Sequence, residues 1–368
     1  MDKQVEKEVG RAVPVRVGIS IGDVNGIGPE VVIKSLADNR LLLDCTPIIY
    51  ASSKTISYHK KAVRQHQFSY QTCKSVNDAI NRKVNIVNVW NEELKFELGQ
   101  GTEVSGKYAF KSLEAATQDL ASGKIDVLVT APISKEAIQK ADFPFPGHTE
   151  YLADKAGTDE VVMMMVNGNL RVALATTHMP LKDVSSSLTK ELVINKVKLL
   201  QKSLISDFGI AKPKIAVLGL NPHAGENGKL GQEEQEIIIP AINSLRENDS
   251  LLAYGPFPAD GFFGSNALGK YDAILAMYHD QGLTAFKALA FDEGVNYTAG
   301  LPIIRTSPDH GTGFDIAGKG VASEQSMRSA IYLAMDIFKV QSNRKEALKN
   351  PLKPQLTDKR RSYKNEKN

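Results

Sequence analysis

The sequence has little cysteine and no long apolar run. Two cysteines, Cys45 and Cys73, and one tryptophan occur in 368 residues. So few cysteines exclude a disulfide scaffold and favour a reducing compartment, so we expect a cytoplasmic protein. Neither a run of about 18 apolar residues nor the apolar core of a signal peptide is present, which predicts no contact with a membrane.

Excess positive charge is confined to one end of the chain. Residues 341–368 hold nine Lys or Arg and three acids, although the formal net charge of the whole chain is only +3. The rest of the chain therefore has a slight excess of acids and lacks the basic surface typical of nucleic-acid binding, so we expect no nucleic-acid partner. A content of 42% hydrophobic and 24% charged residues is that of a globular chain, here long enough for two lobes.

Short β-branched runs alternate with amphipathic helical patterns along most of the chain, which predicts a mainly parallel sheet covered by helices. Asn167 and Gly168 interrupt this alternation between two apolar runs, and they predict a tight β-hairpin within a second lobe. The predicted strands are 15–21, 47–50, 84–89, 127–129, 161–166, 170–175, 215–218 and 273–277. The clearest later helices are 193–204 and 322–338.

Three histidines share one position relative to the predicted strands. His178, His223 and His279 each follow an apolar strand, in the turn where that strand ends. Turns after the carboxyl ends of strands gather along one edge of an α/β sheet, where ligands bind. The three imidazoles are therefore predicted to meet around one divalent ion, although a single histidine in such a turn is more often a hydrogen-bonded loop residue than a ligand. Asp280 would orient a ligand or, as the alternative, cap the helix that follows.

Further polar turns are predicted at the same sheet edge. Residues 20–30 and 130–135 each follow a strand, and residues 146–150 open a helix with His148 and Thr149 at a potential anion site. The alternative for Thr149 is ordinary helix capping. Lys287, Asn296 and Arg305 would supply polar contacts to a phosphorylated substrate, although nothing in their spacing separates them from solvated surface residues.

Eight motifs resemble those of the 4-hydroxythreonine-4-phosphate dehydrogenase family of pyridoxal phosphate biosynthesis, in the same order, over residues 14–340. They are SIGDVNGIGPE at 20–30, TAPISK at 130–135, GHTE at 147–150, TTHMPL at 176–181, LNPHAGE at 220–226, GPFPAD at 255–260, YHDQG at 278–282 and IRTSPDHGT at 304–312. Two departures occur: Thr284 stands where the family often has Pro, and Gly261 where Thr is common.

The resemblance implies two α/β/α lobes with a cleft between them, similar to isocitrate and isopropylmalate dehydrogenases and without a Rossmann fingerprint. We expect a first domain of residues 13–142 plus 289–340 and a second of residues 143–288, which carries the dimer contacts. Residues 1–12 would form a loose lead-in. Residues 341–368 would form a basic, disordered tail.

The resemblance also assigns roles to individual residues. It implies metal binding by His178, His223 and His279, at a site shared between the two subunits of a homodimer, with the His279 strand completing the site of its partner. It implies substrate binding by His148, Thr149, Lys287, Asn296 and Arg305. The ion would be Zn, Mg or Co, one per active site, and the nicotinamide cofactor NAD or NADP; no residue is assigned to the cofactor.

The activity implied is oxidation and decarboxylation of 4-phosphooxy-L-threonine to 3-amino-2-oxopropyl phosphate. A bound ion would lower the pKa of the substrate alcohol, and the nicotinamide would accept the hydride. Metal-bound hydroxide, Lys287 and Asp260 remain open as the proton acceptor. The alternatives are a dehydrogenase of a phosphorylated four-carbon sugar acid (threonate or erythronate 4-phosphate), a metal-dependent phosphatase or hydrolase, and a binding protein without catalysis. The absence of an aspartate cluster beside the histidines argues against hydrolysis at a two-metal site.

Overall fold

The computed structural model describes residues 13–350 except 142 and 159. The predicted lead-in, 1–12, and most of the predicted tail, 351–368, lie outside the described residues. In the described part, no helix is both long and apolar enough to cross a membrane.

The described residues form one sheet of twelve strands. The strands are β1 (Val15–Ser20), β2 (Cys45–Ala51), β3 (Gln71–Cys73), β4 (Asn85–Asn88), β5 (Val127–Thr130), β6 (Val162–Asn167), β7 (Leu170–Leu174), β8 (Lys214–Leu218), β9 (Leu252–Phe257), β10 (Ala273–Ala276), β11 (Val295–Ala299) and β12 (Arg305–Pro308). They lie in the order β3-β4-β2-β1-β5-β12-β11-β6-β7-β10-β8-β9. The strands β1 and β5 are buried along almost their whole length because helices cover both faces.

Strand direction changes in the middle of the sheet. β11 pairs antiparallel with β12 and with β6, and β6 pairs antiparallel with β7, whereas the other neighbours are parallel. The β6–β7 pair is the hairpin predicted from Asn167 and Gly168, and Gly168 adopts a positive φ of 53° in its turn. As a result, β7, β8, β9 and β10 run opposite to β1 and β5, so the two sets of carboxyl ends do not share one sheet edge. The expectation of a single edge for all the polar turns was therefore wrong, because it assumed one strand direction throughout.

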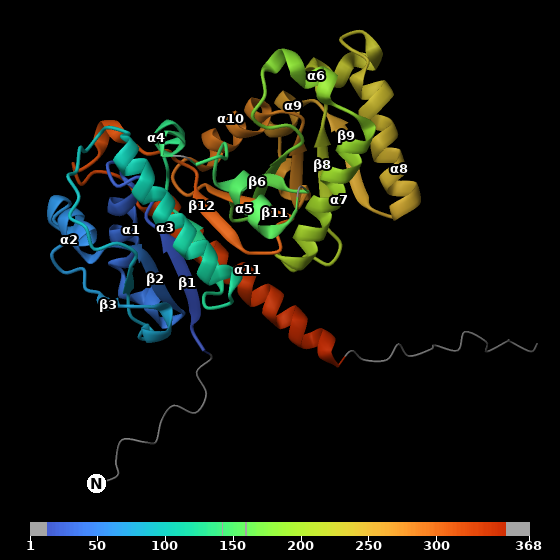
Figure 1. The fold of residues 1–368 in the computed structure, drawn as a ribbon. Helices are drawn as coiled ribbons and strands as arrows, with labels where there is room; N and C mark the ends of the chain where they lie inside the picture. The colour runs from blue at the N-terminus through green and yellow to red at the C-terminus, as the bar shows by residue number, and fades with distance from the viewer. Residues whose placement is uncertain (1–12, 142, 159, 351–368) are drawn as a thin grey trace, which may run out of the picture.

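Helices cover both faces of the sheet (Figure 1). They are α1 (Gly28–Leu36), α2 (Ser53–Ala62), α3 (Glu103–Ala121), α4 (Lys135–Lys140), α5 (His148–Ala156), α6 (Val184–Ser187), α7 (Lys190–Ser206), α8 (Ile239–Asp249), α9 (Ala259–Phe263), α10 (His279–Ala290) and α11 (Gln325–Lys349). Capping side chains determine where several of these helices begin. Thr102, for example, accepts a hydrogen bond from Ser105 N at the beginning of α3. α11 continues to Lys349, so residues 341–349 are helical and the predicted tail began too early, because its charge was taken as a sign of disorder.

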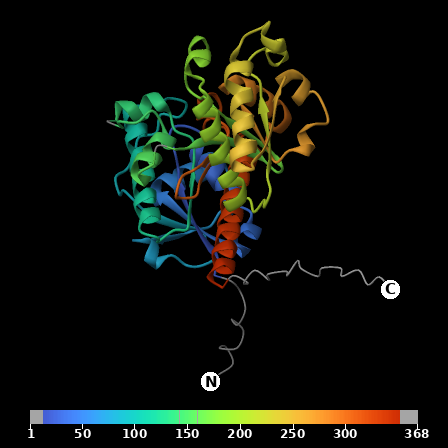
Figure 2. The same ribbon diagram turned by 90° about the vertical axis from the view of Figure 1, so that its right-hand side faces the viewer.

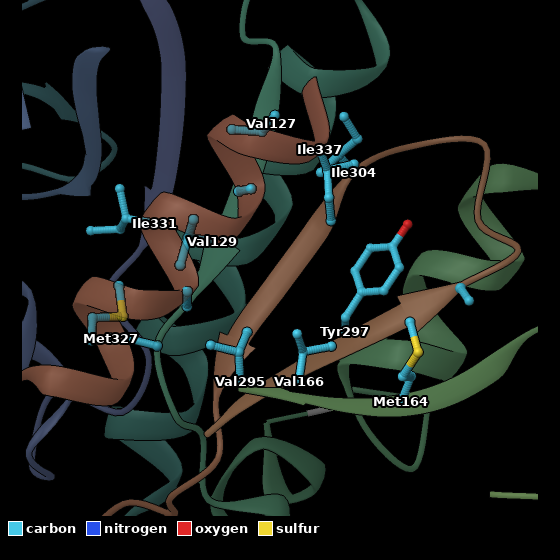
Figure 3. Close-up of a cluster of buried hydrophobic side chains, with 14 of the residues drawn as sticks. Val127, Val129, Met164, Val166, Val295, Tyr297, Ile304, Met327, Ile331 and Ile337 are labelled. Carbon is cyan, nitrogen blue, oxygen red and sulfur yellow. The ribbon is translucent and has the colours of Figure 1, made fainter. Parts of the chain in front are cut away.

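The α11 side of the sheet carries one continuous apolar core. α11 contacts β1, β5, β11 and β12 as well as α1 and α7, and it crosses the middle of the molecule (Figures 1 and 2). Figure 3 shows part of this core, in which side chains of α11 lie over the central strands. The labelled residues are Val127, Val129, Met164, Val166, Val295, Tyr297, Ile304, Met327, Ile331 and Ile337.

The opposite face carries two separate apolar cores. One lies under α3 and α5 and includes Leu113 and Leu152; the other lies under α10 and includes Leu174 and Phe286. Between them, strands β11 and β12 present polar side chains such as Arg305. This break in the core is the cleft between two lobes, so the predicted two-lobed α/β architecture is confirmed.

His59 on α2 makes the fold sensitive to acid. Its imidazole is buried, Nε2 has no partner, and burial lowers its pKa from 6.5 to about 4. Between those two pH values the unfolded chain binds a proton here and the folded protein does not, so the free energy of unfolding falls as pH falls. We expect His59→Gln to remove up to about 3 kcal/mol of this pH dependence between pH 6.5 and 4. Urea unfolding against pH measures it, with the exposed His66→Gln as control; equal slopes for both variants would contradict the prediction.

Candidate active site

Arg305 is the most unusual charged residue in the cleft. It opens β12, is 3% exposed, and donates from Nε and Nη2 to Thr130 Oγ1 at 3.0 and 2.6 Å. Burial lowers its pKa to about 10, which still leaves it charged at neutral pH. Among the described residues no carboxylate lies within ion-pair distance of its guanidinium. A buried cation without a paired anion is costly, so this position favours an anionic ligand.

A cavity of about 220 Å³ lies beside Arg305. It is lined by Thr130, Ala131, Pro132, Ile133, Lys135, Gly147, His148, Thr149, Glu150, Met163, His178, Asn296, Arg305, Ser307, Pro308, His310 and Gly311. Three buried atoms of this lining have no hydrogen-bond partner: His148 Nε2, Asn296 Oδ1 and His310 Nε2. Buried polar atoms are normally satisfied, so these atoms indicate contacts that a ligand completes.

The amino end of α5 closes one side of this cavity. α5 begins at His148 after Gly147, and no side chain caps it, so its first backbone N–H groups are free to bind an anion. Thr149 lies in the first turn, so the capping alternative for it does not apply. Burial first, and the nearby Arg305 second, lower the pKa of His148 well below its ordinary value, which keeps the imidazole neutral.

His178 and His279 come together next to this cavity. His178 follows β7 and His279 begins α10 after β10, and their ring centroids are 5.9 Å apart. His279 Nδ1 lies 2.7 Å from Asp280 Oδ1, the orienting contact expected for Asp280, whereas α10 is preceded by Tyr278 and so is not capped by Asp280. Both histidines also line a larger hollow of about 630 Å³ that opens beyond them. Burial lowers the pKa of His178, and a neutral imidazole is the form that binds a metal.

His223 does not join this pair within one chain. It lies exposed in the turn after β8, in an irregular segment, η4 (Pro222–Gly228). The described residues contain no group of three His, Cys, Asp or Glu side chains placed to hold a metal. The structure thus brings together two of the three predicted ligands. The resemblance implied that the His279 strand completes the partner's site, whereas in this structure His279 lies beside His178 of its own chain.

Lys287 and Asp260, the two residues considered as proton acceptors, lie outside the 220 Å³ cavity beside Arg305. Lys287 lines a neighbouring cavity of about 300 Å³ that shares His310 and Gly311 with it, and Lys287 Nζ lies 3.2 Å from Asp309 Oδ1. Asp260 is exposed on α9, a helix that contacts η4. Asp260 and His223 therefore occupy one region of the second lobe.

Five polar or charged lining residues had no predicted role: Thr130, Lys135, Glu150, Ser307 and His310. Each lies inside a motif quoted above, so membership of a motif was the available signal, but nothing in the sequence gave them a role. Among the described residues that line the 220 Å³ cavity, Glu150 is the one carboxylate.

Several known proteins are similar to this chain in sequence and fold. Residues 43–334 match the family model described as pyridoxal phosphate biosynthetic protein PdxA. A 4-hydroxythreonine-4-phosphate dehydrogenase of Bacteroides thetaiotaomicron is 48% identical, over 94% of this chain and 95% of that protein. A protein of Oceanobacillus iheyensis with the provisional name D-threonate 4-phosphate dehydrogenase is 41% identical, over 87% of this chain and 97% of its own. The crystal structure of the Klebsiella pneumoniae 4-hydroxythreonine-4-phosphate dehydrogenase superposes with a TM-score of 0.77 and 35% identity, covering 89% of this chain and 99% of that one.

Proposed function

The chain belongs to the family of the pyridoxal phosphate biosynthetic protein PdxA, and we infer from this that it is a 4-hydroxythreonine-4-phosphate dehydrogenase. We propose that it oxidises and decarboxylates 4-phosphooxy-L-threonine to 3-amino-2-oxopropyl phosphate, with NAD or NADP as hydride acceptor. The reaction belongs to pyridoxal 5'-phosphate biosynthesis. A cytoplasmic location remains a prediction.

The observation that carries this proposal is the buried, unpaired Arg305 beside an uncapped helix start. Both features favour an anion, and a phosphate group offers oxygens to the guanidinium and to the N–H groups of α5 at once. Asn296 Oδ1 and His148 Nε2 then complete contacts to the rest of the substrate. In this assignment Lys287 adds a positive charge from the neighbouring cavity, where its Nζ lies 3.2 Å from Asp309 Oδ1.

The residues present fit a divalent ion in part. Within one chain, His178 and His279 supply two imidazole nitrogens, the donor type that zinc, cobalt and related ions prefer. When bound, such an ion supplies Lewis-acid chemistry at the substrate alcohol. Asp280 would hold the His279 ring in a fixed orientation through Nδ1.

We propose that a second copy of the chain supplies the missing ligand. His223 is exposed on η4, and α9 with Asp260 packs against η4, so a partner's surface would deliver both residues to the pair His178 and His279. Asp260 would then take the alcohol proton. This arrangement makes the enzyme a homodimer whose contacts lie in a second domain of residues 143–288, with residues 13–142 and 289–340 as the first domain.

The neighbouring 300 Å³ cavity is the candidate site for the nicotinamide end of the cofactor. It adjoins the substrate cavity through His310 and Gly311, and its lining combines apolar side chains, such as Ile27 and Ile316, with hydroxyls from Ser323 and Ser326. The unpartnered His310 Nε2 lies where the two cavities meet. We propose that the cofactor binds here, next to the substrate.

The proposed activity is tested by the absorbance of NADH or NADPH formed by the purified full-length chain with Zn²⁺, Mg²⁺ or Co²⁺. The substrates compared are 4-phosphooxy-L-threonine, D-threonate 4-phosphate and D-erythronate 4-phosphate. We expect the amino acid to give by far the highest kcat/KM. Preference for a sugar acid would overturn this substrate assignment.

Glu150 is the lining residue that favours the amino acid over the sugar acids. The amino acid carries an ammonium group where the sugar acids carry a hydroxyl, and Glu150 provides a carboxylate in the cavity. A carboxylate binds an ammonium group more strongly than a neutral hydroxyl. Oxidation of a phosphorylated sugar acid is the second candidate function, because the relative from Oceanobacillus iheyensis is named for that activity.

Arg305→Ala should act mainly on the KM for the phosphorylated substrate. A charge-assisted hydrogen bond is worth about 1.5 to 3 kcal/mol, which corresponds to a KM raised by about one to two orders of magnitude. Steady-state kinetics of the variant measure the effect, and Arg305→Lys serves as the control that keeps a positive charge. A KM equal to that of the unmodified enzyme would remove Arg305 from the phosphate site.

A further inference from the structure

The segment that carries His223 has an unusual backbone. Residues 223–227 all have positive φ, from 42° to 77°, and only Gly225 among them is glycine. Consecutive left-handed residues are costly for L-amino acids and persist only where the surroundings enforce them. Something next to η4 must therefore hold this turn.

Glu234 lies next to this turn and is bonded to the residues that lead into it. Its side chain is completely buried at the start of η5 (Glu234–Ile238), a single π-helical turn. Oε1 accepts hydrogen bonds from the backbone N–H groups of Leu220 and Asn221, both at 2.7 Å, and Oε2 accepts one from Asn221 Nδ2 at 2.9 Å. The buried carboxylate of Glu234 therefore fixes the backbone of Leu220 and Asn221, which lead directly into η4.

Two glycines let the turn fold directly around this carboxylate. A Cβ atom at Gly219 would lie 3.0 Å from Glu234 Oε1 and 2.9 Å from Ala224 Cα, and one at Gly225 would lie 2.5 Å from Glu234 Oε2. The left-handed segment therefore packs around the Glu234 side chain.

The same cluster connects to the turns that carry the other two histidines. Gln281, two residues after His279, donates from Nε2 to Gly219 O at 2.6 Å. Glu233 accepts from Asn221 Nδ2 at 2.7 Å and is also hydrogen-bonded to Ser185, in the segment that follows His178. The cluster is therefore hydrogen-bonded to α10, which begins at His279, and to α6, which follows the turn that carries His178.

We propose that Glu234 is a positioning residue: it holds the left-handed turn so that His223 is presented in the orientation that metal binding requires. The inference rests on the proposed function, because it assumes that His223 is a ligand. It deepens that function by assigning a role to a residue that neither touches the substrate nor lies in the active-site cavities described above. Outer residues of this kind typically change metal affinity 10- to 100-fold when they are removed.

The test compares Glu234→Ala with Glu236→Ala, an exposed glutamate of the same π-helical turn, in the full-length protein. Co²⁺ affinity is measured by competition with a fluorescent chelator, together with the visible absorption spectrum of the Co²⁺-loaded protein. Hydrogen exchange of residues 219–230 is measured without metal. We expect Glu234→Ala to weaken Co²⁺ binding about 10- to 100-fold, to change the spectrum and to speed exchange of this segment, and Glu236→Ala to do none of these.

Two further variants complete the design. Glu234→Gln keeps an oxygen acceptor for the backbone N–H groups of Leu220 and Asn221, so it should restore most of the Co²⁺ affinity that Glu234→Ala loses. Should Glu234→Ala fail to fold, Asn221→Ala removes the side-chain link while leaving the buried carboxylate on its backbone donors; it should show the same changes in smaller measure.

Unchanged exchange in residues 219–230 would show that Glu234 does not hold the turn. Faster exchange with unchanged Co²⁺ affinity and spectrum would show a purely structural residue; either result overturns the proposal. Failure of the proposed function is recognised separately with His223→Ala. If that variant binds Co²⁺ as the unmodified protein does, His223 is not a metal ligand. The role of Glu234 in positioning His223 for metal is then excluded too, independently of the result for Glu234→Ala.

Discussion

His223→Ala should abolish turnover and sharply weaken metal binding while the fold stays intact. The imidazole is exposed on η4, so its loss removes no core packing. Removal of one of three ligands leaves an ion held by two imidazoles, too few to retain it at the affinity of the complete set. Activity against metal concentration, Co²⁺ titration and thermal unfolding of the metal-free protein measure the three parts of this expectation.

Asn227→Ala is the matched control for this substitution. Asn227 is also exposed and left-handed in η4, with a φ of 55° close to the 53° of His223, so alanine meets the same backbone conformation in both variants. We expect Asn227→Ala to keep its activity. Near-normal turnover of His223→Ala, or of the unmodified enzyme after thorough chelation, would contradict the three-histidine site.

The periodicity of the sequence predicted most of the strands because the sheet is buried on both faces. The apolar runs at 15–21, 127–129 and 215–218 correspond to β1, β5 and β8 within about a residue or two. Strand direction was not predictable in the same way. Pairing of β11 between β12 and β6 is a contact between segments far apart in sequence, and only the Asn167-Gly168 hairpin gave a local sign of an antiparallel strand.

The motifs predicted which residues matter better than they predicted how those residues meet. Asn296 and Arg305 lie on adjacent strands that face one cavity, although nothing in their spacing required it. Lys135 and Glu150 line the same cavity but stayed without a role, because a motif does not say where its side chains point. The separation of His223 from His178 and His279 depends on a left-handed turn. No local sequence pattern predicts five consecutive residues with positive φ.

Mixtures of two impaired variants distinguish a shared site from one built within a single chain. If the partner supplies His223, each active site combines Arg305, His178 and His279 of one chain with His223 of the other. In a heterodimer of His223→Ala and Arg305→Ala, one site then has every native residue and the other lacks two. In a heterodimer of His178→Ala and His279→Ala, each site lacks one ligand, because those two residues lie in the same chain.

The first mixture should therefore regain activity and the second should not. Random exchange of subunits places about half of the dimers in the mixed state, and each carries one native site of two, so recovery should approach about a quarter of the unmodified activity. It is measured with substrate below the raised KM of Arg305→Ala, so that this variant alone contributes little. Subunit exchange is verified by native mass spectrometry. Recovery in the second mixture, or in neither once exchange is shown, would mean that His223 does not reach the partner's histidine pair.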